Sequence, residues 1–556
     1  MAHISDPSPP PICSWESFYR PSDLQPSLNY FQPLSYIAST EPGQHDPNPE
    51  GKVPAPDFRI FNFDHPRNLN NGPRLPTPAQ CAVHLRLLQA FLSLRVNILC
   101  STSLDTALSI EPHTRVVHVP HDYPNHGKLS PKRSFSSRVT PPPKTTVIRV
   151  QDPTFPKRRE EKWDLYLKLA AARFLSWVRA LENAASGELE DIQPPPLDVL
   201  MVWHALLLNP ALLRRFELSH VPLAHLAKIT FPWEKIHNAI SKDDHHTFNL
   251  PTEVASSFTS RTGMEPDLLS FLTAQATRAS RLAKTLRLYG KPGSSTDPFK
   301  SRGLHVTDLP EPDIFTSASD KAYIRLLRSV LGEGDPDFPV IYMLTTAVKR
   351  QSVFVDKMDR MLWIRSPALA GTLCRAVRRY ERFLGLFKFD DAVAPGRCVG
   401  ASTEGAGVGE ERERKKTMLV PTLDVDLVWH THMCTSPEQY ARDCETLAGR
   451  VVEHNDKFGD KSGPGNGGGS SSVYEDALEY TSQLYRVRYG GDYRICLCWE
   501  CEALRSAFDG DGDEDDGLGA LMDGRSIEDV AHEVIIKVTK YREAEQKRRA
   551  GMPRVS

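Results

Sequence analysis

The segment LDVDLVWHTHM, residues 423–433, concentrates side chains that can bind a metal ion or transfer protons. It contains two aspartates and two histidines. On a helix, residues two positions apart point about 200° away from each other, whereas residues four positions apart lie on one face. His430 and His432 are therefore not expected to share an ion. The favoured ligand set is His430 with Asp426 one turn before it and Cys434 one turn after it.

A ligand from another part of the chain would complete this set. Zinc and iron accept imidazole, thiolate and carboxylate ligands, and His454 and Cys444 are the candidates. His454 also begins a His-Asn-Asp sequence, the His-x-Asp form with which 2-oxoglutarate-dependent oxygenases bind iron together with a distant histidine, here His532. Those enzymes need a jelly-roll of strands, and the periodicity around His454 is helical, so this alternative is disfavoured.

The same segment has a purely structural interpretation, which the sequence favours. In this interpretation Trp429 anchors the core, Asp424 caps the start of a helix and the histidines form local hydrogen bonds. Metal binding by His430, Asp426 and Cys434 is the alternative.

A second candidate metal site is the sequence CLCWEC. It places Cys496, Cys498 and Cys501 in a C-x-C-x-x-C pattern, one ligand short of a closed tetrahedral zinc site, and a histidine or Cys444 is the candidate fourth ligand. Buried free thiols are the alternative. The acidic run that begins at Asp509 lacks the glycine and the final glutamate of a calcium-binding loop and is predicted to be a solvated loop.

An earlier segment, LDVLMVWHALL at residues 197–207, repeats the frame of LDVDLVWHTHM. In chain order, residues 197–207 are the first motif and residues 423–433 are the second. The aligned pairs are Asp198 with Asp424, Trp203 with Trp429, and His204 with His430. Each copy follows a long amphipathic segment and a proline, and the first copy has Leu206 at the position of His432. The sequence therefore predicts an internal duplication with two related helix–turn–helix units.

These motifs resemble the conserved N-terminal region of the glycine-rich domain-containing protein family. The resemblance covers roughly residues 77–501 and rests on four segments, at 195–210, 376–388, 420–444 and 449–457. It implies a mainly helical domain without an established enzymatic activity. Plant members of the family carry a long glycine-rich tail, and because the printed sequence contains no comparable tail, no role of that tail is carried over.

Helical periodicity predicts a mainly α fold. Apolar residues at steps of three and four predict a helix that begins after Thr77 as N-cap, with Pro78 in its first turn, and a long helix that includes residues 167–181. Further helices are predicted at 266–289, which Gly290 would terminate, and at 320–332, 339–358 and 366–387. The sequence TTVIRV at 145–150 predicts one strand.

Composition along the chain predicts its domain organisation. The predicted parts are a largely disordered proline-rich tail at 1–76, a first helical half at 77–290, a linker at 291–312, a second helical half at 313–508, an acidic loop at 509–524 and a C-terminal helix at 525–548. Glycine-rich and charged insertions are expected to decorate the second half without altering its core.

Overall composition narrows the classes of partner and location. The 68 lysines and arginines nearly balance the 70 aspartates and glutamates, so no field favours nucleic acid or an anionic membrane. The segment judged most apolar, residues 199–208, is shorter than the ~20 residues of a membrane span, and no transmembrane helix is predicted. Ten scattered cysteines without a secretory leader favour the cytoplasm, with the nucleus as the alternative.

The sequence therefore predicts an intracellular, non-enzymatic helical scaffold or interaction protein. Its expected partner is an unidentified protein, and no cofactor is expected. The alternative is a metal-dependent enzyme that holds zinc, or iron as in the oxygenases, at the motif of Trp429 and His430.

Overall fold

A computed structural model describes most of the 556-residue chain. The described residues are 58–63, 73–111, 115–120, 145–150, 155–182, 191–217, 226, 229–241, 246–291, 303–393, 418–454, 469–508 and 526–550. Most of the predicted N-terminal tail, most of the glycine-rich and charged insertions and the acidic loop lie outside these residues.

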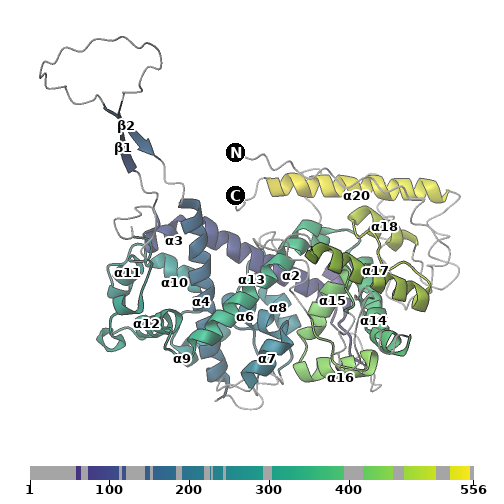
Figure 1. Ribbon diagram of the computed structural model, residues 1–556, viewed down its shortest axis with the longest axis horizontal. Coiled ribbons are helices and arrows are strands. Elements are labelled where there is room, and N and C mark those ends of the chain that lie inside the picture. The colour runs from purple at the N-terminus through teal and green to yellow at the C-terminus, as the bar shows by residue number, and fades with distance from the viewer. Residues whose placement is uncertain are drawn as a thin grey trace, which may run out of the picture.

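The described part of the chain is mainly α, as predicted, with one two-stranded ribbon (Figure 1). Its helices are α2 (Pro78–Cys100), α3 (Thr102–Ala107), α4 (Phe155–Glu182), α6 (Leu197–Leu207), α7 (Pro210–Glu217), α8 (Trp233–Ala239), α9 (Thr252–Thr262), α10 (Leu268–Ala274), α11 (Arg281–Leu286), α12 (Ala318–Leu331), α13 (Phe338–Met361), α14 (Leu369–Val393), α15 (Leu423–Met433), α16 (Pro437–Ala448), α17 (Gly469–Tyr489), α18 (Trp499–Phe508) and α20 (Ile527–Ala550). Short 3-10 turns, among them η7 (Trp363–Arg365), connect some of them.

Helix α2 runs through the centre of the molecule. The side chain of Thr77 accepts a hydrogen bond from the backbone N–H of Gln80, whose own side chain accepts one from the N–H of Thr77, so the predicted start is confirmed and closed by a capping box. By length and composition α2 is the one described helix that could cross a membrane, whereas α6, which contains most of the apolar segment 199–208, is shorter. Half of its most apolar window is buried, and the core helix of a globular protein passes the same test.

The predicted strand at 145–150 is confirmed as β2 (Thr145–Val150). Its antiparallel partner β1 (Arg115–Pro120) was not predicted, and the register pairs Arg115 with Val150 and Pro120 with Thr145. The ribbon projects away from the helical body (Figure 1).

The single helix predicted at 266–289 is wrong, because the chain forms the two short helices α10 and α11 there. Ser280 caps the start of α11, and the guanidinium group of Arg287 donates to backbone oxygens of the connecting turn, which stabilises the break. Gly290 does not cap α11, which ends at Leu286 with Arg287 as its C-cap. A Cβ at Gly290 would lie 2.4 Å from the backbone oxygen of Ser109, so close backbone approach is what requires glycine.

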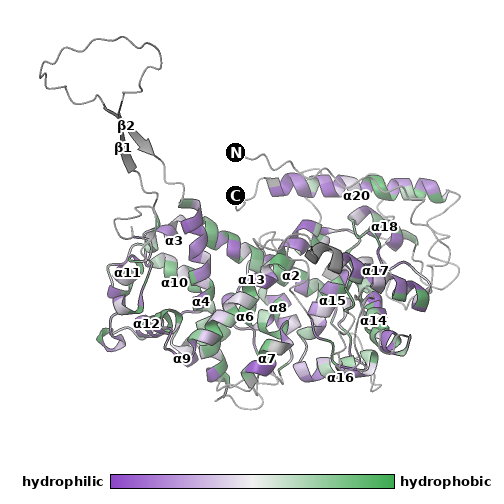
Figure 2. Ribbon diagram, in the orientation of Figure 1, coloured by the Kyte–Doolittle hydropathy of each residue, from purple (hydrophilic) through white to green (hydrophobic). Residues whose placement is uncertain are grey.

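The two predicted halves share one hydrophobic core. Helix α2 packs against α4 and α8 and also against α13, α14 and α15, and α13 in turn packs against α4 and α6. Figure 2 shows α20 as a largely hydrophilic helix at the edge of the body, where it packs on α18. The motif helices α6 and α15 therefore lie within one continuous structure.

Candidate functional site

The two motifs occupy helices of the same length in similar surroundings. Helices α6 and α15 each contain eleven residues, each follows a long helix, α4 or α14, and each precedes a further helix, α7 or α16. Trp203 is fully buried and Trp429 is 3% exposed, which confirms both tryptophans as core residues.

Asp198 and Asp424 bind arginines from the preceding long helices. The Nε atom of Arg173 in α4 lies 2.6 Å from a carboxylate oxygen of Asp198, and the Nε atom of Arg379 in α14 lies 2.6 Å from a carboxylate oxygen of Asp424. The expectation that these aspartates occupy the N-cap positions is wrong. Those positions belong to Pro196 and Thr422, neither of which forms a side-chain cap.

Aromatic contacts extend the correspondence between the two motifs. One turn after Arg173, Trp177 contacts Trp203 with ring centroids 5.3 Å apart. One turn after Arg379, Phe383 contacts Trp429 with centroids 5.5 Å apart. Each motif therefore combines an arginine–aspartate pair with an aromatic contact, although internal duplication itself stays a prediction.

The histidine of the first motif belongs to a buried hydrogen-bonded chain. His204 Nε2 lies 2.8 Å from His84 Nε2, and His84 Nδ1 lies 2.9 Å from the hydroxyl oxygen of Thr431. The Thr431 hydroxyl donates to the carbonyl of Leu427, so its oxygen accepts from His84 Nδ1–H, and His204 then donates through Nε2–H. One choice of tautomers satisfies these contacts, which join α2, α6 and α15.

The second histidine of the later motif is also structural. His432 is fully buried, and its Nδ1 and Nε2 atoms lie 2.9 Å from the hydroxyl of Tyr380 and 3.1 Å from a carboxylate oxygen of Asp443. Both ring nitrogens are therefore engaged, and this ring is separate from the candidate metal ligands.

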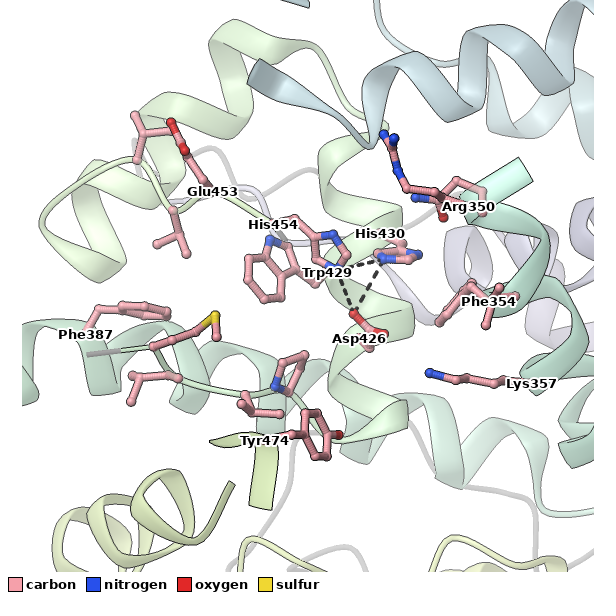
Figure 3. A pocket seen from close by; sticks show the side chains of 18 of the residues that line it. Arg350, Phe354, Lys357, Phe387, Asp426, Trp429, His430, Glu453, His454 and Tyr474 are labelled. Carbon is pink, nitrogen blue, oxygen red and sulfur yellow. Dashed lines mark hydrogen bonds and ion pairs between the residues drawn. The ribbon is translucent and has the colours of Figure 1, made fainter. Parts of the chain in front are cut away.

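Asp426, His430 and His454 form the candidate metal centre (Figure 3). The Nε2 atoms of the two histidines are 3.0 Å apart, and Asp426 Oδ1 lies 3.1 Å from His454 Nε2 and 3.5 Å from His430 Nε2. The structure thus brings together two residues of the favoured set and one of the two candidates for its completion. Cys434 and Cys444 do not join the group.

Cys434 stays out of the cluster because α15 ends at Met433. Cys434 occupies the C-cap position with a fully buried thiol, and burial raises its pKa well above the usual value. Cys444 in α16 lies beside Tyr440, whose hydroxyl accepts a hydrogen bond from Trp429 and donates one to the carbonyl of Val452.

The spacing of the three ligand atoms fits a transition-metal ion. The point that is equally distant from the three ligand atoms lies about 1.9 Å from each of them. This distance is slightly shorter than the ~2.0–2.2 Å of zinc–nitrogen and zinc–oxygen bonds. Asp426, His430 and His454 would together hold such an ion and would leave further coordination positions open.

Hydrogen bonds satisfy this cluster only in part. His454 Nε2 faces both Asp426 Oδ1 and His430 Nε2, and a single N–H on that atom cannot point at both partners. His430 Nδ1 is buried and has no hydrogen-bond partner among the described residues. A cation at the centre would instead accept one lone pair from each of the three atoms.

Burial keeps His430 in the neutral form that a metal ligand requires. Desolvation lowers the pKa of His430 well below its usual value, and the neighbouring His454 and Lys357 lower it further. Its ring packs against Phe354, with centroids 4.1 Å apart.

The cluster faces a cavity of about 500 Å³. Its walls come from α13, α14, α15 and α17 and from segments 418–421 and 450–454. Figure 3 shows Arg350, Phe354 and Lys357 on one helix, α13, across the cavity from His454. An ion in the cluster would therefore be accessible to a small molecule, with basic side chains on the opposite wall.

Comparison with known proteins places the second motif in a family. A family description, glycine-rich domain-containing protein-like, matches residues 409–443. In this segment the chain is similar to the glycine-rich domain-containing protein-like family. The segment contains Asp426 and His430, whereas His454 follows it.

Two plant relatives in the family show the extent of the similarity. Glycine-rich domain-containing protein 1 of Arabidopsis thaliana is 33% identical over 164 residues, which are 29% of this chain and 15% of the relative. Glycine-rich domain-containing protein 2 of the same plant is 33% identical over 159 residues, which are 29% of this chain and 16% of the relative. The matches thus span about one sixth of each relative, and no solved structure matches.

The cysteines of CLCWEC also converge in the structure. The Sγ atoms of Cys496, Cys498 and Cys501 lie within 4.8 Å of one another at the start of α18, and no candidate fourth ligand joins them among the described residues. Cys444 is therefore not part of this group.

The oxygenase-like arrangement has no counterpart in the described residues. His454 contacts Asp426, whereas His532 is exposed on α20, and Asn455 and Asp456 lie outside the described residues. The described strands are β1 and β2, which do not form a jelly-roll.

The sequence predicted neither the basic wall of the cavity nor the role of His84. Arg350 and Lys357 lie on a helix that was predicted, but its sequence alone does not indicate which motif it faces. A signal for His84 was available, because a histidine on the apolar face of a predicted helix needs a buried polar partner.

Proposed function

We propose that this protein is metal-dependent and that its centre is formed by Asp426, His430 and His454. The observation that carries the proposal is the convergence of three ligand atoms, 3.0–3.5 Å apart, on the wall of a cavity. Three protein ligands with further positions open to a small molecule are the pattern of catalytic zinc sites. The proposed function is therefore metal-assisted chemistry on a small substrate.

The proposed chemistry is that of a Lewis acid. A divalent ion with free positions polarises a bound carbonyl or phosphoryl oxygen and lowers the pKa of bound water. Lys357 and Arg350 lie on the opposite wall of the cavity, which favours an anionic substrate. Two imidazoles and one carboxylate suit zinc and ferrous iron alike, and zinc is the ion we propose first.

The scaffold interpretation is the second candidate, and the first motif favours it. Asp198 forms an ion pair with Arg173, and Trp203 is buried in the core. Burial lowers the pKa of His204 to about 3, so its ring is neutral and forms a hydrogen bond with His84. A protein partner and a cytoplasmic or nuclear location remain proposals that rest on the sequence alone.

Calorimetric titration of the full-length protein with zinc chloride separates the two candidates. His454→Gln and Asp426→Asn each remove one ligand, so each should lose one bound equivalent of zinc, with affinity at that site reduced more than about 100-fold. The control is His532→Gln, because His532 is an exposed histidine on α20. If the two ligand variants bind zinc as the control does, the metal centre is wrong and the scaffold interpretation stands.

A further inference from the structure

We propose a second metal site, in which Cys496, Cys498 and Cys501 bind a zinc ion through three thiolates. It lies outside the cavity of the Asp426 cluster and stands independently of the function proposed there. We assign this ion a structural role. It would hold the segment that leads into α18 in place, and α20 packs on α18.

The positions of the sulfur atoms fit a single ion. All three Sγ atoms lie within 4.8 Å of one another. Tetrahedral zinc with bonds of ~2.3 Å holds its sulfur ligands about 3.8 Å apart, so a small inward movement of the side chains completes the site. The fourth position is left to water, since no other histidine, cysteine or carboxylate among the described residues joins the group.

The backbone around the cysteines is already held in place. Trp363 Nε1 donates to the carbonyl of Leu497 over 3.0 Å, and Arg505 Nη1 donates to the carbonyl of Cys496 over 2.7 Å. The carbonyl of Cys498 accepts from the backbone N–H of Glu502 in the first turn of α18. These bonds present the three side chains together before an ion arrives, which lowers the entropic cost of binding.

The three thiols are accessible to an ion, and the ion would convert them to thiolates. Cys501 is buried and the other two are half-buried, so an ion has access from solvent. A divalent cation deprotonates its thiol ligands. The N-terminal end of α18 adds a favourable electrostatic field.

The other cysteines near the core give a contrast that supports this choice. Cys81 and Cys434 are fully buried, and desolvation raises the pKa of each thiol, that of Cys81 to about 12. Neither belongs to a group of three metal-binding side chains in the described part of the chain. They fit the alternative of buried free thiols, whereas two of the CLCWEC cysteines are half-buried and all three lie together.

Cobalt titration of the reduced full-length protein tests the site. Cobalt bound to thiolates absorbs in the near ultraviolet through sulfur-to-metal charge transfer, whereas cobalt bound to imidazole and carboxylate does not. We expect this band to grow to one equivalent, to disappear in Cys498→Ser and Cys496→Ser, and to persist in the control Cys100→Ser, which changes an exposed cysteine. Zinc should displace the cobalt and abolish the band.

Thermal melts with circular dichroism establish that each variant is folded. A folded wild-type protein that shows no charge-transfer band, or a band that survives in both serine variants, would overturn the proposal. His454→Gln should keep the band, so failure of the cavity site and failure of the cysteine site give different results.

Discussion

Asp424 and Asp426 are two residues apart on α15, yet their carboxylates have opposite environments. Asp424 is buried against Arg379, whereas the side chain of Asp426 is 18% exposed and faces the cavity beside His430. Burial raises the pKa of the Asp424 carboxyl group, but Arg379 and Thr422 lower it by more, so the net pKa lies below the usual range. One turn of helix thus contributes one carboxylate to packing and one to the candidate centre.

Replacing these two aspartates should therefore give very different losses of stability. Asp424→Ala leaves the buried Arg379 without its partner and should lower the free energy of unfolding by about 3–5 kcal/mol. Asp426→Ala removes a carboxylate from a cavity wall and should cost less than about 1 kcal/mol in metal-free protein. Urea unfolding of both variants measures the difference, and equal losses would contradict the separation of roles.

His432→Ala should destabilise the protein although His432 is not a metal ligand in this account. The substitution leaves the Tyr380 hydroxyl and a carboxylate oxygen of Asp443 without a buried partner, which should cost about 2–4 kcal/mol. Zinc binding per folded molecule should stay unchanged. Urea unfolding and metal analysis check the two statements, and a loss of zinc without a loss of stability would reverse the assignment.

Single residues show what the local sequence could predict. The four-residue spacing of Asp426 and His430 was sufficient to pair them, because both lie inside one helix. The same rule failed for Cys434, because the helix ends one residue before it. His454 could only be proposed as one of two distant candidates, since the fold of segment 450–454 over α15 has no signature in the sequence.

At the scale of elements, α13 contributes a basic wall to the cavity. Arg350, Phe354 and Lys357 occur at steps of four and three residues and so share one helix face, which forms the wall opposite His454. Because Lys357 also lowers the pKa of His430, its charge acts on the metal ligands as well as on the cavity.

Lys357→Ala should weaken anion binding to the zinc-loaded protein. With inorganic phosphate as the probe, removal of one nearby positive charge should reduce affinity about 5- to 10-fold and leave zinc stoichiometry unchanged. The control is Lys540→Ala, because Lys540 is an exposed lysine on α20. Calorimetry measures both affinities. Equal phosphate affinity in the two variants would show that α13 does not face the bound anion.

Elements with long apolar periodicity were predictable, and short ones were not. Helices α2, α12, α13 and α14 begin within three residues of the predicted positions, because each buries a continuous apolar face. The region 266–289 keeps a helical pattern across a break that Ser280 and Arg287 stabilise through backbone contacts. Such contacts depend on the tertiary fold and do not change the spacing of apolar residues in the sequence.

At the scale of the whole molecule, buried histidines join parts of the chain that the sequence assigns to different halves. His84 links to His204 and Thr431, and His430 lies beside α13. Burial lowers the pKa of His84, His204 and His430, that of His204 to about 3. The sequence predicted two halves from local repetition, and the shared core between them depends on long-range packing that repetition does not encode.

These histidines should make the metal-free protein sensitive to acid. Below pH ~6.5 the unfolded chain binds protons at these side chains while the folded chain does not, so the unfolded state binds more protons and stability falls as pH falls. Each histidine contributes at most about 1.4 kcal/mol per pH unit. Urea unfolding at pH 7 and pH 5 measures the loss, and a stability that is constant or higher at pH 5 would contradict the buried, neutral state of these rings.

Anomalous X-ray scattering at the zinc edge from crystals grown with zinc tests the proposed metal centre. We expect a peak about 2.0–2.2 Å from Asp426 Oδ1 and from the Nε2 atoms of His430 and His454. The same data should lack that peak in crystals of His454→Gln. Zinc peaks elsewhere in the wild-type protein, with none among these three side chains, would contradict the account.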